Sequence, residues 1–168
     1  MKRYSLLQSL VAFLVVSLCS LPVLAATGDT PSPDDDDAHH AHHAWHAAFF
    51  VGSSTTHGQS YAAFGADVLY QPSFLKQRVS VGLLGDIVLA DHLHGLAAAN
   101  VVFHPFGNFG ANVAPGVFFV DGHQYAAIRT GVSYNFAFGN ASIAPTLNWD
   151  FAHGEVHRNA GFMFGIGL

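Results

Sequence analysis

The chain has 168 residues, of which 51% are hydrophobic and only 10% are charged, whereas a soluble domain usually carries about 25% charged residues. This composition excludes a disordered chain, and a formal net charge of −5 excludes a basic nucleic-acid-binding surface. Beyond the N-terminal segment, no stretch reaches the roughly 18 consecutive apolar residues that a transmembrane helix needs. Because only helices and closed β-barrels satisfy every backbone polar group within lipid, the composition favours a membrane-spanning β-barrel.

Residues 1–25 are predicted to be a secretory signal peptide. Lys2 and Arg3 supply the positive charge, residues 6–18 form the apolar stretch, and Ala25 completes a small-residue cleavage site. The one cysteine of the chain, Cys19, lies within this segment. The exported protein is therefore expected to contain neither a disulfide nor a reactive thiol. Cleavage would leave four basic residues against 11 acidic ones.

Residues 26–44 are predicted to be a flexible linker, because they are rich in Pro, Asp and His and poor in large apolar side chains. Histidines cluster at the end of this linker and just beyond it, at His39, His40, His42, His43 and His46. Imidazoles beside carboxylates are suited to binding zinc, copper or nickel. The alternative is a solvated tether without a metal.

From Trp45 onward, apolar and polar residues alternate with a period of two, which is typical of β-strands with one apolar face. Turn-rich separators divide the sequence into eight such segments. They are His46–Ser53, Ser60–Tyr70, Arg78–Leu89, Gly95–His104, Gly110–Val120, Gln124–Phe136, Ala141–Phe151 and His157–Leu168. Residues 45–168 are therefore predicted to form an all-β fold, an eight-stranded antiparallel up-and-down transmembrane β-barrel with meander topology.

Each predicted strand has one face on which we expect no formal charge; in the second strand it carries Phe64, Val68 and Tyr70. A soluble ligand-binding barrel has its apolar residues inside, whereas a charge facing lipid near the midplane costs about 2–4 kcal/mol. The uncharged faces are therefore expected to face lipid, and the charges to face the lumen. Arg129 is the only basic residue on the inner faces, and we predict that it pairs with Asp86 or Asp150. The predicted lumen network comprises Asp67, Asp86, Arg129 and Asp150.

Histidines and carboxylates collect at the connections after the first, third, fifth and seventh strands, and therefore at one rim of the barrel. The members are His57, Asp91, His92, His94, Asp121, His123, His153, Glu155 and His157. Such a ring could bind a divalent transition metal such as zinc, copper or nickel, or could titrate near neutral pH. The alternative is that these residues are ordinary polar turn residues, since no spacing among them fixes a metal geometry.

Four segments resemble small, poorly characterised outer-membrane β-barrel proteins of Gram-negative bacteria: Phe103–Pro105, Ala114–Gly116, Gly131–Phe136 and Ser142–Phe151. The resemblance covers about residues 45–168 and implies an outer-membrane location with both termini in the periplasm. The last strand, with alternating Phe162, Phe164 and Ile166, resembles the signal read by the barrel-assembly machinery, although Leu168 stands in place of the usual terminal aromatic residue. Expected partners are outer-membrane lipids, lipopolysaccharide, that machinery and periplasmic chaperones, with the barrel as a monomer.

We expect a structural role or the binding or transport of a small ligand, without a wide pore, an enzymatic activity or a required cofactor. The small inward residues allow at most a narrow cavity, because eight strands enclose little more than their own side chains. One alternative is a metal-binding surface protein that uses the loop and tail histidines. Another is an outer-membrane lipid deacylase. For this alternative, the inward-facing Ser80 and Ser133 have no evident inward histidine nearby.

Overall fold

The computed structural model describes residues 45–75 and 78–168, so the predicted signal peptide and the linker lie outside the described residues. Strands account for most of the described chain, and one short 3-10 helix, η1 (Ser73–Leu75), precedes the third strand. The strands are β1 (Trp45–Thr56), β2 (Gln59–Tyr70), β3 (Val79–Leu89), β4 (Leu93–Phe103), β5 (Phe109–Val120), β6 (His123–Tyr134), β7 (Phe136–Phe138), β8 (Ala141–Ala152) and β9 (Glu155–Gly167). Among these residues no helix is long and apolar enough to cross a membrane.

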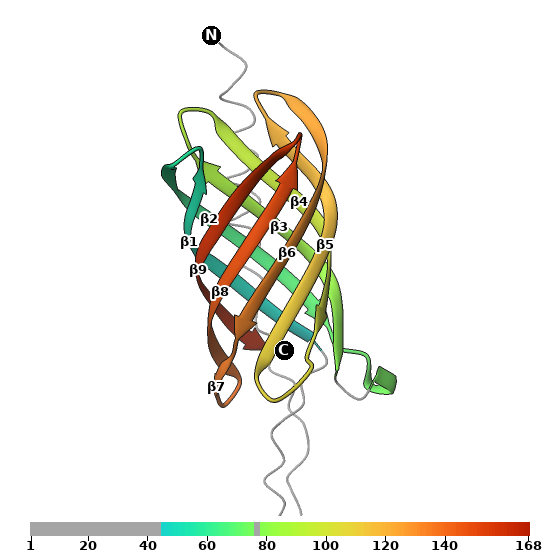
Figure 1. Cartoon of the computed structure of the whole chain (residues 1–168). Helices are drawn as coiled ribbons and strands as arrows, with labels where there is room; N and C mark the ends of the chain where they lie inside the picture. Colours follow the sequence, from blue (N-terminus) through green and yellow to red (C-terminus); the bar gives the residue numbers. More distant parts are fainter. Residues whose placement is uncertain (1–44, 76–77) are drawn as a thin grey trace, which may run out of the picture. The chain divides into compact units, whose positions relative to one another are not determined.

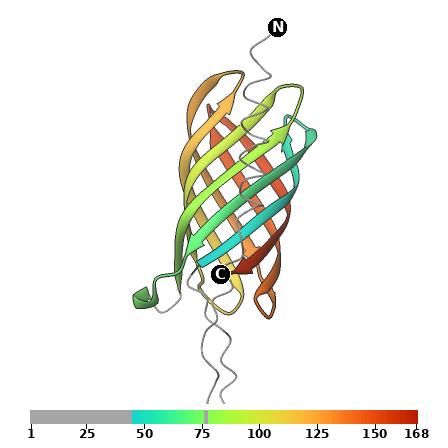
Figure 2. The ribbon, with the colours of Figure 1, turned by 180° about the vertical axis from the view of Figure 1, so that it is seen from behind.

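The strands form a closed antiparallel β-barrel (Figures 1 and 2). Consecutive strands pair with each other, except β6 and β7, and β1 pairs with β9 from His46–Gly167 to Thr55–Arg158, which closes the wall. The short β7 continues β6 beyond Asn135, and both pair with β8. The wall therefore has eight strands in meander order, which confirms the predicted fold class. We call the end at which β9 finishes the C-terminal rim, and the other end the opposite rim.

The eight predicted segments coincide with the observed strands, apart from a few residues at their ends. β1 extends to Thr56 rather than Ser53, because its turn is tight: His57 and Gly58 both have positive φ, at 49° and 78°. Two residues with positive φ make a type I′ turn, whose twist matches that of the paired strands. The predicted sixth strand is interrupted at Asn135, whose backbone N–H donates to the Asn108 carbonyl at 2.8 Å.

The outward face is apolar around the barrel, as the period-two pattern predicts. Leu83 is 70% exposed, and Phe162 and Ile128 are each 51% exposed. Of the charged residues in the strands, Asp67, Asp86, Arg129 and Asp150 are buried in the lumen and Glu155 lies at the opposite rim. Arg158 of β9 is exposed on the outer face, beside Trp149 of β8. Our expectation of uncharged outer faces is therefore wrong at this position. Arg158 lies near the opposite rim, where an outward charge costs only about 0–1 kcal/mol because it reaches the headgroups.

Two apolar clusters occupy part of the lumen. One contains Phe118 and Leu96 together with Leu84 and four alanines, and the other contains Phe50, Ala63 and Val88. The Phe118 ring also lies against His157 of β9, with the ring centroids 4.7 Å apart. These contacts fill the lumen toward the opposite rim, so the polar interior is concentrated between them and the C-terminal rim.

Candidate functional site

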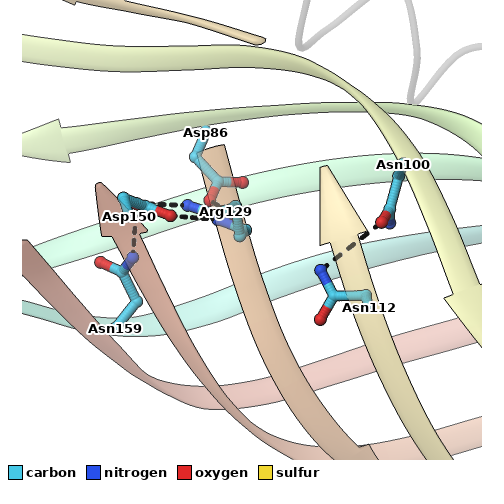
Figure 3. Close-up of polar contacts among 6 residues, drawn as sticks. All are labelled: Asp86, Asn100, Asn112, Arg129, Asp150 and Asn159. Carbon is cyan, nitrogen blue, oxygen red and sulfur yellow. Dashed lines mark hydrogen bonds and ion pairs between the residues drawn. The ribbon is translucent and has the colours of Figure 1, made fainter. Parts of the chain in front are cut away.

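An ionic network crosses the lumen between strands that are not neighbours in the wall (Figure 3). Arg129 of β6 faces Asp150 of β8 in the strand register and donates to it twice, from Nε to Oδ1 at 2.5 Å and from Nη2 to Oδ2 at 2.8 Å. Its Nη1 forms an ion pair with Asp86 of β3. Asn159 of β9 donates from Nδ2 to Asp150 Oδ2 at 2.7 Å. The guanidinium therefore joins two carboxylates, where the sequence predicted one or the other.

Glycines make the space for these polar side chains. Gly65 of β2 lies opposite Asp86 in the register, and a Cβ at that position would collide with the Asp86 carboxylate. Gly131 of β6 plays the same part for Asn112 and Asn148, whose amide oxygens occupy the position that its Cβ would take. Gly65 and Gly131, which are among the small inward residues, are thus part of a packed interior.

Asp67 of β2, the fourth residue of the predicted network, lies apart from these contacts. Its side chain points inward and the residue is 8% exposed. Among residues 45–75 and 78–168, Oδ1 of Asp67 has no hydrogen-bond partner, and no ion pair joins this carboxylate to a cation. The predicted network is therefore divided into a paired group around Arg129 and a separate carboxylate.

Asp67 lines a cavity of about 420 Å³ inside the barrel. The cavity reaches the C-terminal rim, where Gln71, Gly107 and Asn108 line it, and it extends inward to Asp86 and Arg129. Between these ends polar side chains, Asn100, Asn112 and Asn148 among them, line the cavity beside apolar ones such as Leu84 and Met163. Asn112 Nδ2 donates to Asn100 Oδ1 at 3.5 Å (Figure 3). The volume falls in the range of small-molecule sites, about 300–1,000 Å³.

The cavity wall also holds a serine–histidine pair that we did not expect. Ser80 of β3, which is 2% exposed, has its Oγ 3.1 Å from Nε2 of His104, just beyond the end of β4. The expectation that Ser80 lacks an inward histidine is therefore wrong. The inward phase of β4 continues through Val102 to His104, and this alternation was the signal that could have found the pair. Burial lowers the pKa of His104, and the nearby His46 lowers it further.

This pair lacks two features of a lipid deacylase. Within the described part of the chain, no carboxylate is hydrogen-bonded or ion-paired to His104, so no third residue orients its ring. The serine also faces the lumen, whereas the acyl chains of membrane lipids would contact the outside of the barrel. The arrangement is that of a buried hydroxyl whose hydrogen bond is satisfied by a neighbouring imidazole.

Three of the rim histidines lie beside carboxylates. His92 Nδ1 lies 3.1 Å from Asp121 Oδ1 across two turns. Glu155 lies between His57 and His157, with its oxygens 3.7 Å and 3.8 Å from their Nε2 atoms. Within residues 45–75 and 78–168, no three His, Cys, Asp or Glu side chains converge as a group that could hold a metal ion.

The remaining members of the predicted ring have other surroundings. The His94 ring lies edge-on to His157, with centroids 6.2 Å apart, and His153 packs on Tyr125 at 4.2 Å. His123 lies 6.4 Å from the same tyrosine ring, and Asp91 is exposed in the β3–β4 turn. Of the tail histidines, His46 begins the inward face of β1. The others, His39, His40, His42 and His43, lie outside the described residues. Metal binding by either group stays a prediction.

Turn geometry gives a structural reason for two of these histidines. His57 and His153 have φ of 49° and 51°, each is followed by a glycine with φ of 78°, and Asp121 with Gly122 repeats the arrangement. His, Asn and Asp are enriched among the few non-glycine residues that adopt positive φ. The rim is therefore rich in these residue types partly because tight type I′ turns require them.

No protein-family model matches the chain, and no curated protein matches its sequence. One solved structure, from a study described as de novo design of transmembrane β-barrels, matches with a TM-score of 0.52 and 10% identity over 74% of this chain and 98% of that one. The chain has the fold of a transmembrane β-barrel. Neisserial surface protein A matches with a TM-score of 0.47 and 10% identity, over 74% of this chain and 96% of that one. The N-terminal β-barrel domain of Pseudomonas aeruginosa OprF matches with a TM-score of 0.48 and 16% identity, over 72% of this chain and 97% of that one. At these identities the likeness concerns the fold alone.

Proposed function

We propose that this protein is a monomeric, non-enzymatic outer-membrane β-barrel of a Gram-negative bacterium that binds a small polar molecule in its lumen and forms no wide pore. The observation that carries the proposal is a cavity lined by both polar and apolar side chains, open toward one rim and bounded inward by the Arg129 network, inside a wall whose outer face is apolar. Lipid and lipopolysaccharide would surround this wall. Periplasmic chaperones would carry the unfolded protein to the outer membrane, and the barrel-assembly machinery would insert it there.

The apolar outer face supports the membrane location on energetic grounds. Large side chains such as Leu83, Ile128 and Phe162 are about half exposed or more on several strands. A soluble monomer rarely exposes contiguous apolar patches beyond a few hundred Å². Hydrocarbon is the solvent that makes such a surface stable.

We further propose that the C-terminal rim faces the periplasm, so that the cavity is reached from that side. Single-cysteine variants test this orientation, because the one native cysteine, Cys19, lies in the predicted signal peptide. His123→Cys at the opposite rim should react with a membrane-impermeant maleimide on intact cells, whereas Asn140→Cys should react only after the cells are opened. The reverse pattern would contradict the orientation.

Conductance and fractionation test the function. The full-length protein should sediment with the outer membrane, and the purified barrel should give no sustained single-channel current in a planar bilayer. A steady current typical of a diffusion porin would overturn the proposal, since the Arg129 network and the apolar clusters would then have to leave an open path.

A further inference from the structure

We propose that the lumen cavity is a site for a small organic cation, with Asp67 as the anion that binds a primary ammonium group. This inference rests on the proposed function, because it names the chemical class of the small molecule. It begins from Asp67 itself, a buried carboxylate that lines the cavity and has an oxygen without a hydrogen-bond partner among the described residues.

The charge of the lumen points to a missing cation. Between the rims, the described inward side chains include the carboxylates of Asp67, Asp86 and Asp150, the single guanidinium of Arg129, and the imidazoles of His46, His104 and His157. His104 is hydrogen-bonded to Ser80, and His157 lies beside Glu155. That guanidinium is already joined to Asp86 and Asp150. A buried carboxylate without a partner is costly, whereas a paired one has its charge compensated. A positively charged ligand beside Asp67 would supply that compensation.

The surroundings favour an organic ammonium over a metal ion. No three His, Cys, Asp or Glu side chains of the described residues converge on a metal position, whereas transition metals are usually held by several such ligands. The cavity of about 420 Å³ also far exceeds the size of an ion. An ammonium group has three N–H donors. The Asp67 carboxylate can accept one of them, and the amide oxygen of Asn100 and the hydroxyl of Ser133 line the same cavity as acceptors for other polar groups of a ligand.

The remaining wall suits a short aliphatic chain. Phe50, Leu84 and Met163 line the cavity together with the polar groups, so methylene groups attached to the ammonium would lie against apolar surface. Gln71 and Asn108 line the cavity at the C-terminal rim, which gives access from that side. A small aliphatic amine or diamine fits this combination better than a bare ion or an anion does.

The test is isothermal titration calorimetry of the folded full barrel in zwitterionic detergent, with 1,4-diaminobutane as the probe. We expect saturable binding to the unchanged protein and a loss of affinity of at least about tenfold in Asp67→Asn, because the variant removes a charge-assisted hydrogen bond. Asp91→Asn, which removes an exposed carboxylate from the opposite rim, is the matched control and should bind as the unchanged protein does. Circular dichroism and heat-modifiable gel mobility establish that each variant is folded, and Asp67→Glu should retain binding if Asp67→Asn unfolds.

Four results would overturn the inference. They are absence of saturable diamine binding, equal affinity in Asp67→Asn, equal displacement of the diamine by potassium at matched concentration, and preferential binding of neutral 1,4-butanediol. The last result would leave the proposed small-ligand function intact and change only the ligand class. A porin-like current, in contrast, would overturn the proposed function itself, so the two failures are distinguishable.

Discussion

Arg129 and Asp86 form an ion pair across the lumen, although their strands β6 and β3 are separated in the wall by β4 and β5. The same guanidinium makes two hydrogen bonds to Asp150 on the neighbouring β8. Arg129 therefore links β3 to β6 and β8 on the other side of the lumen. The remaining inward carboxylate, Asp67, is outside this arrangement and faces the cavity.

Replacing Arg129 should destabilise the barrel strongly. Arg129→Met leaves Asp86 and Asp150 as buried charges without their cation, and breaking such a pair costs about 3–5 kcal/mol. Urea unfolding in detergent micelles, followed by tryptophan fluorescence, measures the loss. Arg158→Met is the matched control, because Arg158 lies exposed on the outer face, and it should change stability by less than about 1 kcal/mol. Equal effects of the two changes would mean that Arg129 is not paired inside.

A methyl group at Gly65 should also destabilise the barrel, because it would occupy the position of the Asp86 carboxylate. We expect Gly65→Ala to cost about 1–3 kcal/mol, the usual range for overpacking. Gly85→Ala is the control, since its added Cβ would meet only the Leu96 carbonyl oxygen at 3.8 Å. Combining Gly65→Ala with Asp86→Ala should show coupling in a double-mutant cycle. Strict additivity would contradict the proposed steric cause.

Acid should reduce the contribution of His104 to the stability of the barrel. Burial lowers the pKa of His104 in the folded barrel, whereas an unfolded histidine titrates near about 6.5. The unfolded chain therefore binds more protons, so this histidine contributes a loss of stability as pH falls below that value and no loss above it. The difference in unfolding free energy between the unchanged protein and His104→Gln should shrink as pH falls. If this difference in unfolding free energy stays constant as pH falls below about 6.5, the imidazole of His104 is not buried in its neutral form.

The β8–β9 turn separates a backbone role of histidine from a metal-binding role. His153 has φ of 51°, and a non-glycine residue in the left-handed region costs roughly 1–2 kcal/mol, less for His, Asn and Asp. His153→Asn should therefore keep the unfolding midpoint, whereas His153→Val should lower it. Zinc, copper and nickel titrations of the same variants test the predicted metal role. If both variants lose metal affinity and unfold at the same midpoint as the unchanged protein, His153 is there to bind metal rather than to form the turn.

The alternation of residue types predicts the strands and the direction in which each side chain points, because a strand has a side-chain period of two. It places Asp86, Arg129 and Asp150 inside, as the structure does. It does not predict which inward groups meet, since contacts across the lumen depend on the stagger of the whole wall. That is why the double pairing of Arg129 and the separation of Asp67 emerge only in the folded barrel. The contact between Ser80 and His104 joins β3 to the residue that follows its neighbour β4, so the inward phase of β4 could have predicted it.

Spin-label accessibility tests the central claim, that hydrocarbon surrounds the wall, most directly. A nitroxide attached at Leu83→Cys, on the outer face of β3, is measured in lipid vesicles against one at His123→Cys near the opposite rim. We predict that the label at position 83 collides with oxygen dissolved in the bilayer and is shielded from a water-soluble nickel complex, whereas the label at 123 shows the reverse. Free access of the nickel complex to position 83 would contradict a transmembrane barrel.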